Sequence, residues 1–121
     1  MYDGTAYQNQ GSALFVDSGT SHLVTPVYLP QGALIKKLVA FAFDNTTLSN
    51  ITVYLYRDVQ NSNTGQTMAG FATSNSPDVQ KLMDDTVGYS TINNGQYSYH
   101  IQASIYGPSV SLYTVKIVYY Y

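Results

Sequence analysis

Residues 96–106, QYSYHIQASIY, decide the fold because their apolar and polar side chains alternate with a period of two. One face is apolar or aromatic and carries Tyr97, Tyr99, Ile101, Ala103 and Ile105. The other face carries Ser98, His100, Gln102 and Ser104. Side chains alternate between the two faces of a β-strand, whereas an α-helix repeats about every 3.6 residues. The stretch therefore predicts a strand with one buried and one solvated face.

Turn residues bound this strand on both sides, with Asn-Asn-Gly at 93–95 and Gly-Pro-Ser at 107–109. Residues 110–121 then return as a long final strand. The pattern places its apolar side chains on two faces. Val110, Leu112, Val118 and Tyr120 share one face, and Tyr113, Val115, Ile117 and Tyr119 share the other.

The upstream chain alternates apolar runs with turn signals. Short apolar runs at 13–16 and 23–28 are separated by a turn at 17–21, and Pro26 indicates an edge strand or a break. A Pro-Gln-Gly turn at 30–32 precedes the longest apolar segment, 33–43. We expect this segment and residues 51–57 to be adjacent, central strands, and we expect a further strand at 67–73.

Residues 77–87 are open to two interpretations. Ser76, Pro77 and Asp78 form a helix-start signature, Val79, Leu82 and Met83 follow at helical spacing, and Gly88 suits a helix end. A strand is common at this place in all-β sandwiches. We expect one short helix or helical turn here, with a strand as the alternative.

Composition and turn spacing predict an all-β fold. Charged residues make up 10% of the 121 residues and Glu is absent, whereas surface helices usually carry Glu and Lys. Seven or eight mostly antiparallel strands with turns about every ten residues are typical of a β-sandwich or jelly roll. We expect one domain over residues 1–121, held without disulfides because the chain has no cysteine.

Several segments resemble a group of secreted bacterial proteins without known activity. The segments are PVYLPQGALI at 26–35, FDN at 43–45 and VYLYR at 53–57, with NGQYSY at 94–99 and LYTVKI at 112–117. The resemblance implies an exported β-sandwich located outside the cell. It implies no activity, because the shared residues occupy turn and strand positions. The group often has a Ser/Thr-rich strand where this chain has the helix-like segment 77–87.

The sequence lacks recognisable catalytic chemistry. There is no cysteine and no G-x-S-x-G motif, and the two histidines, His22 and His100, are interpreted as solvated surface residues. Asp84 and Asp85 suit a solvated segment end better than an acid/base pair. Loops at 17–20 and 44–47 contain oxygen ligands that calcium could use, yet these residues are also typical of turns. The sequence therefore predicts no enzyme, no cofactor and no metal.

Charge and hydropathy narrow the partners. The five basic residues are scattered along the sequence and the net charge is -2, which argues against nucleic acid and anionic lipid. No apolar run is long enough to span a membrane. Low charge with abundant Ser, Thr, Asn, Gly and Tyr favours an extracellular protein or one on the surface of a cell or particle.

Thirteen tyrosines are the unusual feature of the composition. They fit a buried core or cross-strand aromatic pairs, but some could also form an interface or a ligand surface. The candidates for such a surface are Tyr54, Tyr56, Tyr97, Tyr99, Tyr113, Tyr119 and Tyr121.

Three functions follow from these features. The first is a structural or adhesive subunit that self-associates into an oligomer or fibre, with residues 111–121 as an edge strand open to pairing. The alternative is a carbohydrate-binding module that uses exposed tyrosines. A hydrolase would require His22 or His100 within hydrogen-bond reach of a Ser or Asp in a cleft.

Overall fold

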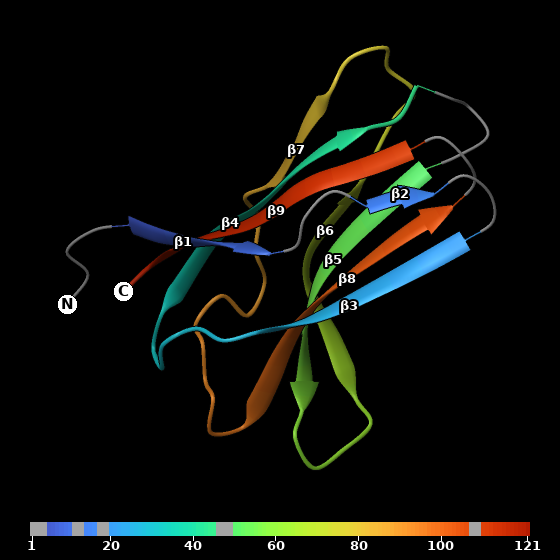
Figure 1. Ribbon diagram of the computed structural model, residues 1–121. Coiled ribbons are helices and arrows are strands. Elements are labelled where there is room, and N and C mark those ends of the chain that lie inside the picture. Colours follow the sequence, from blue (N-terminus) through green and yellow to red (C-terminus); the bar gives the residue numbers. More distant parts are fainter. Residues whose placement is uncertain (1–4, 11–13, 17–19, 46–49, 107–109) are drawn as a thin grey trace.

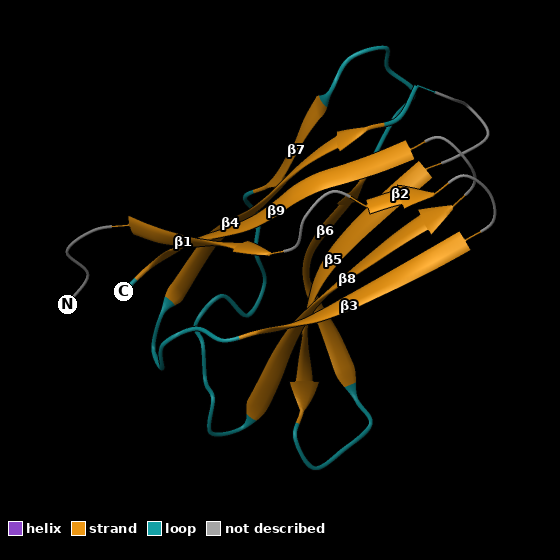
Figure 2. Cartoon of the chain, viewed as in Figure 1, coloured by secondary structure: helices purple, strands orange, loops and turns teal. Residues whose placement is uncertain are grey.

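The computed structural model describes residues 5–10, 14–16, 20–45, 50–106 and 110–121. Over these residues the chain forms nine strands and no helix, arranged as two antiparallel sheets (Figures 1 and 2). The two sheets pack over a shared apolar core. The predicted all-β sandwich is therefore confirmed. Strands β1 (Thr5–Gln10) and β7 (Gln80–Asp84) are the two that the sequence pattern did not predict as strands.

The first sheet, sheet A, has five strands in the order β1-β9-β4-β7, and β2 also pairs with β9. In addition to β1 and β7 it contains β2 (Leu14–Val16), β4 (Leu34–Phe43) and β9 (Val110–Tyr120). The second sheet, sheet B, has the order β3-β8-β5-β6. Its strands are β3 (Thr20–Val27), β5 (Asn50–Val59), β6 (Gly65–Ala72) and β8 (Tyr97–Tyr106).

The core lies between the sheets and follows the period-two pattern. On β5, Ile51, Val53 and Leu55 are fully buried, and on β8 the predicted inward residues Tyr99, Ile101, Ala103 and Ile105 are buried. Sheet A contributes Leu38, Ala40 and Ala42 from β4. Each fully buried Leu or Ile side chain contributes about 1.5–3 kcal/mol through removal of apolar surface from water.

The prediction that residues 33–43 and 51–57 form adjacent strands is wrong in one respect. Strand β4 lies in sheet A between β9 and β7, and β5 lies in sheet B between β8 and β6. Both strands are central, which explains their long apolar runs. They do not pair because the chain crosses from one sheet to the other between them, so their apolar side chains meet across the core.

The prediction that the final strand is an exposed edge is also wrong. Strand β9 pairs with β4 on one side and with β1 and β2 on the other. Its backbone hydrogen-bonding groups are therefore already paired on both sides. The strand has no free edge through which it could pair with a second molecule.

A bulge in β9 also corrects the predicted faces of this strand. Ala42 pairs with Leu112 and Phe41 pairs with Thr114, so Tyr113 is an extra residue in the ladder. A bulge of this kind shifts the alternation of side chains by one. Leu112 and Ile117 consequently both lie in the core, although a regular strand would place them on opposite faces.

The helix expected within residues 77–87 is not formed, which corrects that prediction. Residues 80–84 form strand β7, antiparallel to β4 from Leu38 to Ala42. Exposure alternates along it, with Leu82 packed against the core and Met83 exposed. The backbone of this segment forms hydrogen bonds with the open side of β4. This pairing outweighs the local preference for a helix that the spacing of three apolar residues indicates.

Edge strands are limited in how they could pair further. Strand β3, which contains Pro26, is an edge of sheet B, as the proline predicts. On the opposite edge, the Gly70 N–H of β6 donates to the Asp84 carboxylate at 3.0 Å. The Gly88 N–H donates to the Met68 carbonyl at 2.8 Å. Side chain and loop therefore occupy part of the outer edge of β6.

Two predicted turns are confirmed by their hydrogen bonds. The Ala33 N–H donates to the Pro30 carbonyl at 3.0 Å, and Gly32 has a φ of 83°, a left-handed value that glycine adopts without strain. At the start of β8, the Gly95 N–H donates to the Asn93 side chain at 3.1 Å. This Asx turn fixes the entry into the strand on which the candidate site is built.

Candidate functional site

The outer face of sheet B carries a group of aromatic and polar side chains on its two central strands. On β5 the residues that alternate with the buried Val53 and Leu55 point outward, which places Tyr54 and Tyr56 on this face. Strand β8 places His100 and Gln102 beside them, because Tyr56 pairs with His100 and Tyr54 with Gln102. We call this surface the tyrosine face, formed by Tyr54, Tyr56, Asp58, His100 and Gln102.

The Tyr54 ring lies against the backbone of the neighbouring strand β6. Tyr54 pairs with Gly70, and a Cβ atom at Gly70 would lie 2.0 Å from Tyr54 Cδ1. Only glycine leaves room for the ring at this position. The ring centroids of Tyr54 and Tyr56 are 5.9 Å apart. The planes of the two rings are tilted by 41° to each other, and together they form a short aromatic row along the strand.

His100 joins this row and connects it to a carboxylate. Its ring is stacked with that of Tyr56, with centroids 5.1 Å apart and an interplanar angle of 24°. Its Nδ1 lies 2.6 Å from Asp58 Oδ2. Because a carboxylate only accepts hydrogen bonds, Nδ1 carries the donated proton. The histidine side chain is 23% exposed and the aspartate side chain 40%, so both remain accessible to a ligand.

These residues line one shallow hollow of about 260 Å³. Its lining consists of Tyr56, Asp58, Asn63, Gly65, His100 and Gln102. The hollow thus offers an aromatic surface together with a carboxylate, an imidazole and two amides. It is smaller than the cavities of roughly 300–1,000 Å³ that hold drug-sized molecules, so it suits one small polar ring.

Another hollow, of about 310 Å³, lies at the end of β5 and is lined by Gln60, Gln96 and Tyr97 among others. The side chains of Gln60 and Gln96 in this hollow are already hydrogen-bonded within the protein. The Gln60 side-chain amide donates to the carbonyls of Asn94 and Tyr97 at 3.0 and 3.2 Å. We therefore place the candidate site at the tyrosine face.

Both histidines satisfy the distance condition set for a hydrolase, but they do not form a triad. His22 Nδ1 is hydrogen-bonded to Ser104 Oγ at 2.9 Å, and His100 is bonded to Asp58. The serine and the second histidine are four residues apart on β8, which corresponds to roughly 13 Å along a strand. A nucleophile, its base and the orienting carboxylate must lie in one hydrogen-bonded chain. Ser104 is also only 5% exposed.

The seven candidate tyrosines lie in different surroundings in the structure. Tyr54 and Tyr56 form the tyrosine face. Tyr99 is 4% exposed and lies in the core, where its hydroxyl accepts the Asn93 N–H at 2.8 Å, so it does not belong to an exposed surface. Tyr97 and Tyr119 pack against the core. Tyr113 and Tyr121 are exposed, and neither lines the hollow at the tyrosine face.

Four polar residues of the hollow were not recognised from the sequence as members of one site. His100 and Gln102 fall on the predicted polar face of their strand, and Asp58 and Asn63 fall in a predicted polar loop. The missing information was the register that pairs Tyr56 with His100. The sequence did show two outward tyrosines on one predicted strand and a polar face on another predicted strand. These two features would have pointed to the site if the two strands had been expected to pair.

The described residues contain no group of three or more His, Cys, Asp or Glu side chains that could hold a metal ion. Residues 17–19 and 46–49 of the two calcium-candidate loops lie outside the described residues. Asp44 is 1% exposed and accepts a hydrogen bond from the Thr73 hydroxyl at 2.6 Å. Its carboxylate therefore has a structural partner. Among the described residues no helix could cross a membrane.

Comparison with protein-family models and with curated proteins finds no match to this sequence.

Proposed function

We propose that this protein is a non-enzymatic, adhesive carbohydrate-binding module that acts outside the cell and uses the tyrosine face to bind a neutral glycan. The observation that carries the proposal is the stacked Tyr56–His100 pair, with Asp58 hydrogen-bonded to the histidine in the same hollow. Low charge and the resemblance to secreted proteins support the extracellular location.

The chemistry of the hollow matches that of a sugar ring. A pyranose has C–H groups on its faces, which pack on aromatic rings, and hydroxyls around its edge, which need hydrogen-bonding partners. Tyr56 in the hollow supplies the first requirement, and Tyr54 beside it extends the aromatic surface. Asp58, Asn63 and Gln102 supply acceptors and donors for the second. Such a mixture of an apolar surface and a few convergent polar groups is typical of ligand sites.

The charge of the hollow favours a neutral sugar over an acidic one. The described residues of its lining include the Asp58 carboxylate and no lysine or arginine. An acidic sugar would bring a second negative charge beside this carboxylate, and like charges held close together repel each other. The histidine bonded to Asp58 fixes the orientation of the carboxylate without supplying a dedicated anion site.

The test is binding to an array of neutral and acidic glycans by the wild type and single tyrosine variants. We expect binding to neutral glycans that is lost in Tyr54→Ala and Tyr56→Ala. Tyr113→Ala and Tyr121→Ala are the matched controls, because both remove exposed tyrosines that lie outside the tyrosine face. Absence of binding to any neutral glycan, or equal loss in the control variants, would refute the proposal.

Self-association is the second candidate function, and one observation favours it. Val24 is 60% exposed and Tyr28 is 80% exposed, on and just after the edge strand β3. Exposed apolar side chains beside an edge strand are typical of interfaces. A deletion of residues 115–121 would remove the middle of sheet A, so it cannot test this function.

The appropriate test of self-association is the mass in solution of the wild type and of a Val24→Ser, Tyr28→Ser double variant. An oligomer that dissociates in the double variant supports self-association through β3. A wild type that stays monomeric at high concentration rules it out.

A further inference from the structure

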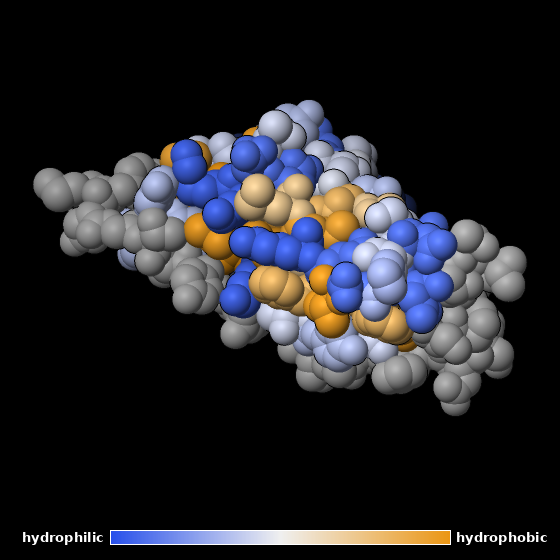
Figure 3. All heavy atoms as spheres, turned by 90° about the horizontal axis from the view of Figure 1, so that it is seen from above, coloured by the Kyte–Doolittle hydropathy of each residue, from blue (hydrophilic) through white to orange (hydrophobic). Residues whose placement is uncertain are grey.

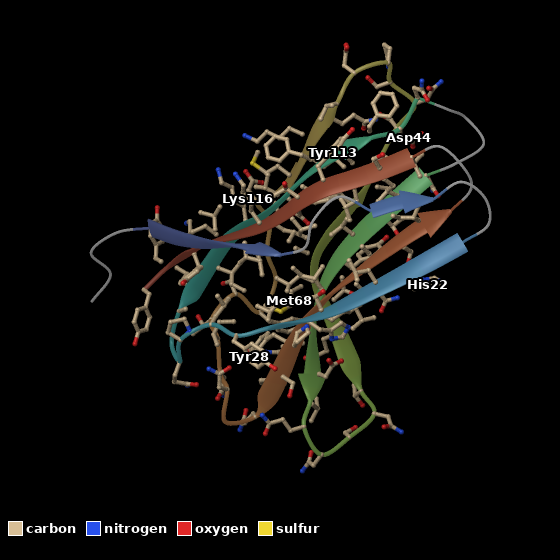
Figure 4. All side chains as sticks on the ribbon, viewed as in Figure 1. His22, Tyr28, Asp44, Met68, Tyr113 and Lys116 are labelled. Carbon is tan, nitrogen blue, oxygen red and sulfur yellow. The ribbon has the colours of Figure 1, made fainter. Side chains whose placement is uncertain are left out.

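Lysines that are far apart in the sequence converge on the outer face of sheet A. Lys37 lies on β4, Lys81 on β7 and Lys116 on β9. Together with Val39, Phe41 and Val118 they line one hollow of about 210 Å³. We call this set of six residues the lysine face. It lies on the side of sheet A away from the core, as the labelled Lys116 and Tyr113 show in contrast to Met68 between the sheets (Figure 4).

Strand register brings the three ammonium groups close to one another. Lys81 is opposite Phe41, Lys116 is opposite Val39, and Lys37 is opposite Val118. Strand spacing and rise place their Cα atoms within roughly 8–14 Å of each other. This separation is comparable to the Debye length of about 8 Å at physiological ionic strength, so their potentials overlap. Positions that look scattered in the sequence therefore form one positive surface.

The surface between the lysines is apolar. Val39 is only 4% exposed although it lies on the outer side of the sheet, because neighbouring side chains cover it. Lys116 Nζ lies 5.4 Å from the centroid of the Phe41 ring. Met83 of β7, which pairs with Val39 of β4, is 49% exposed. Hydrophobic patches crossed by hydrophilic side chains are visible on this side of the molecule (Figure 3).

A neighbouring hollow extends the positive surface. It has a volume of about 420 Å³, shares Lys37 and Val118 with the first and adds Lys36, Tyr120 and one carboxylate, Asp85. Four of the five basic residues of a chain with a net charge of -2 thus line two adjoining hollows. The outer face of sheet A is therefore positively charged, in contrast to the tyrosine face, which carries the Asp58 carboxylate.

The lining of the 210 Å³ hollow determines which anion fits. Among the residues whose side chains the structure describes, the lining contains no hydroxyl, amide or carboxylate. A sugar placed there would lose the hydrogen bonds of its hydroxyls with water and gain few in return, which is costly. There is also no arginine to bind one oxyanion in a bidentate manner. Lysine point charges around aliphatic and aromatic groups fit a surface that is both anionic and apolar beneath its charges.

We propose that the lysine face docks on a lipid bilayer that contains anionic headgroups. The ammonium groups of Lys37, Lys81 and Lys116 meet the phosphates, and Phe41, Val118 and Met83 face the boundary between headgroups and acyl chains. Each lysine near such a surface strengthens binding about five-fold. The tyrosine face, on the other sheet, remains available for a ligand, and the two proposals can fail independently.

The first test is co-sedimentation with vesicles of phosphatidylcholine, alone or mixed with phosphatidylglycerol. We expect binding only to the mixed vesicles, and weaker binding as salt is raised. A Lys37→Gln, Lys81→Gln, Lys116→Gln variant should bind roughly 100-fold more weakly. Its glycan binding and its melting temperature should be unchanged, which separates this inference from the proposed function and from misfolding.

A matched control lowers the net charge by the same amount at other places. The variant Asn61→Asp, Asn75→Asp, Gln96→Glu changes three exposed residues outside the lysine face. It should bind the mixed vesicles nearly as well as the wild type. Equal loss in both triple variants would show that only the overall charge matters and would overturn the proposal.

A second readout uses the absence of tryptophan from the chain. A single tryptophan at Met83→Trp should shift its fluorescence to the blue on addition of the mixed vesicles. A tryptophan at Val24→Trp, on the other sheet, should not. Failure of the wild type to bind the mixed vesicles overturns the proposal. Lysine-dependent binding to soluble polygalacturonate, without binding to vesicles, would also overturn it and would assign the face to an acidic polysaccharide.

Discussion

The guanidinium carbon of Arg57 lies 3.7 Å from the centroid of the Tyr89 ring. On its other side the Tyr97 centroid is 4.0 Å away, so two aromatic rings enclose the cation. Its Nε donates to the Gln66 side chain at 2.6 Å. Tyr89 has a φ of 51°, an uncommon left-handed value for an aromatic residue. Packing on Arg57 thus joins β5, β6, β8 and the loop before β8 at one end of the sandwich.

Removing this cation should destabilise the fold. Arg57→Ala loses two cation–π contacts and one hydrogen bond, and we expect the free energy of unfolding to fall by about 2 kcal/mol. Arg57→Lys should recover only part of this loss, because an ammonium group cannot stack its plane between two rings. Urea denaturation of the three proteins measures both effects. Equal stability of Arg57→Ala and the wild type would show that the contacts contribute nothing.

Asp84 should make stability depend on pH. The Gly70 N–H donates to its carboxylate and lowers its pKa below the ordinary value of 3.8, and hydrogen bonds from Thr86 lower it further. A depressed pKa in the folded state means that the stabilisation is complete above the unfolded value. It is lost as pH falls through the folded value.

Asp84→Asn should therefore be less stable than the wild type at neutral pH, by about 1 kcal/mol for a solvent-accessible charged hydrogen bond. The difference should shrink when both proteins are unfolded with urea at progressively lower pH, below 3.8. A difference that is constant over this range would contradict the role of the charge. Asp85→Asn, on the exposed neighbour, is the matched control.

The sequence predicted local structure well because local structure depends on the alternation of neighbouring residues. Residues 96–106 form the expected strand with the expected buried face, and Pro26 lies on an edge strand. Pairing between distant strands was predicted poorly, since any apolar strand can pair with several others. The central position of β9 and the bulge at Tyr113 depend on such partners, and neither leaves a local signal.

The same limit applies to the two proposed surfaces. Tyr54 and Tyr56 were candidates from the outset, but their union with His100 depends on the pairing of β5 with β8. Lys37, Lys81 and Lys116 looked scattered because their strands come from three separate parts of the chain. The sequence shows which residue types are present on each strand. It does not show which of them lie side by side, because that depends on the order and register of the strands.

Asp44 and Thr73 connect the ends of the two sheets. The Thr73 hydroxyl donates to the buried Asp44 carboxylate at 2.6 Å and accepts the Ile51 N–H at 3.0 Å. Thr73→Val keeps the shape of the side chain but deprives the carboxylate of a donor, and should lower the free energy of unfolding by about 1–3 kcal/mol. Thermal unfolding measures this change. Thr86→Val is a control at an exposed position, where a smaller effect is expected.

Gly70→Ala tests whether the position of the Tyr54 ring matters for ligand binding. An added Cβ would lie 2.0 Å from Tyr54 Cδ1, so the ring must leave its place over β6. Because the obstacle is a side chain that can rotate outward, the cost in stability should be only about 1 kcal/mol. Binding to neutral glycans should nevertheless weaken almost as much as in Tyr54→Ala. At Gly88 the nearest atom to an added Cβ is 3.8 Å away, so Gly88→Ala should bind normally. If Gly70→Ala also bound normally while Tyr54→Ala did not, the tyrosine would act from another position, and the aromatic row would not be the binding platform.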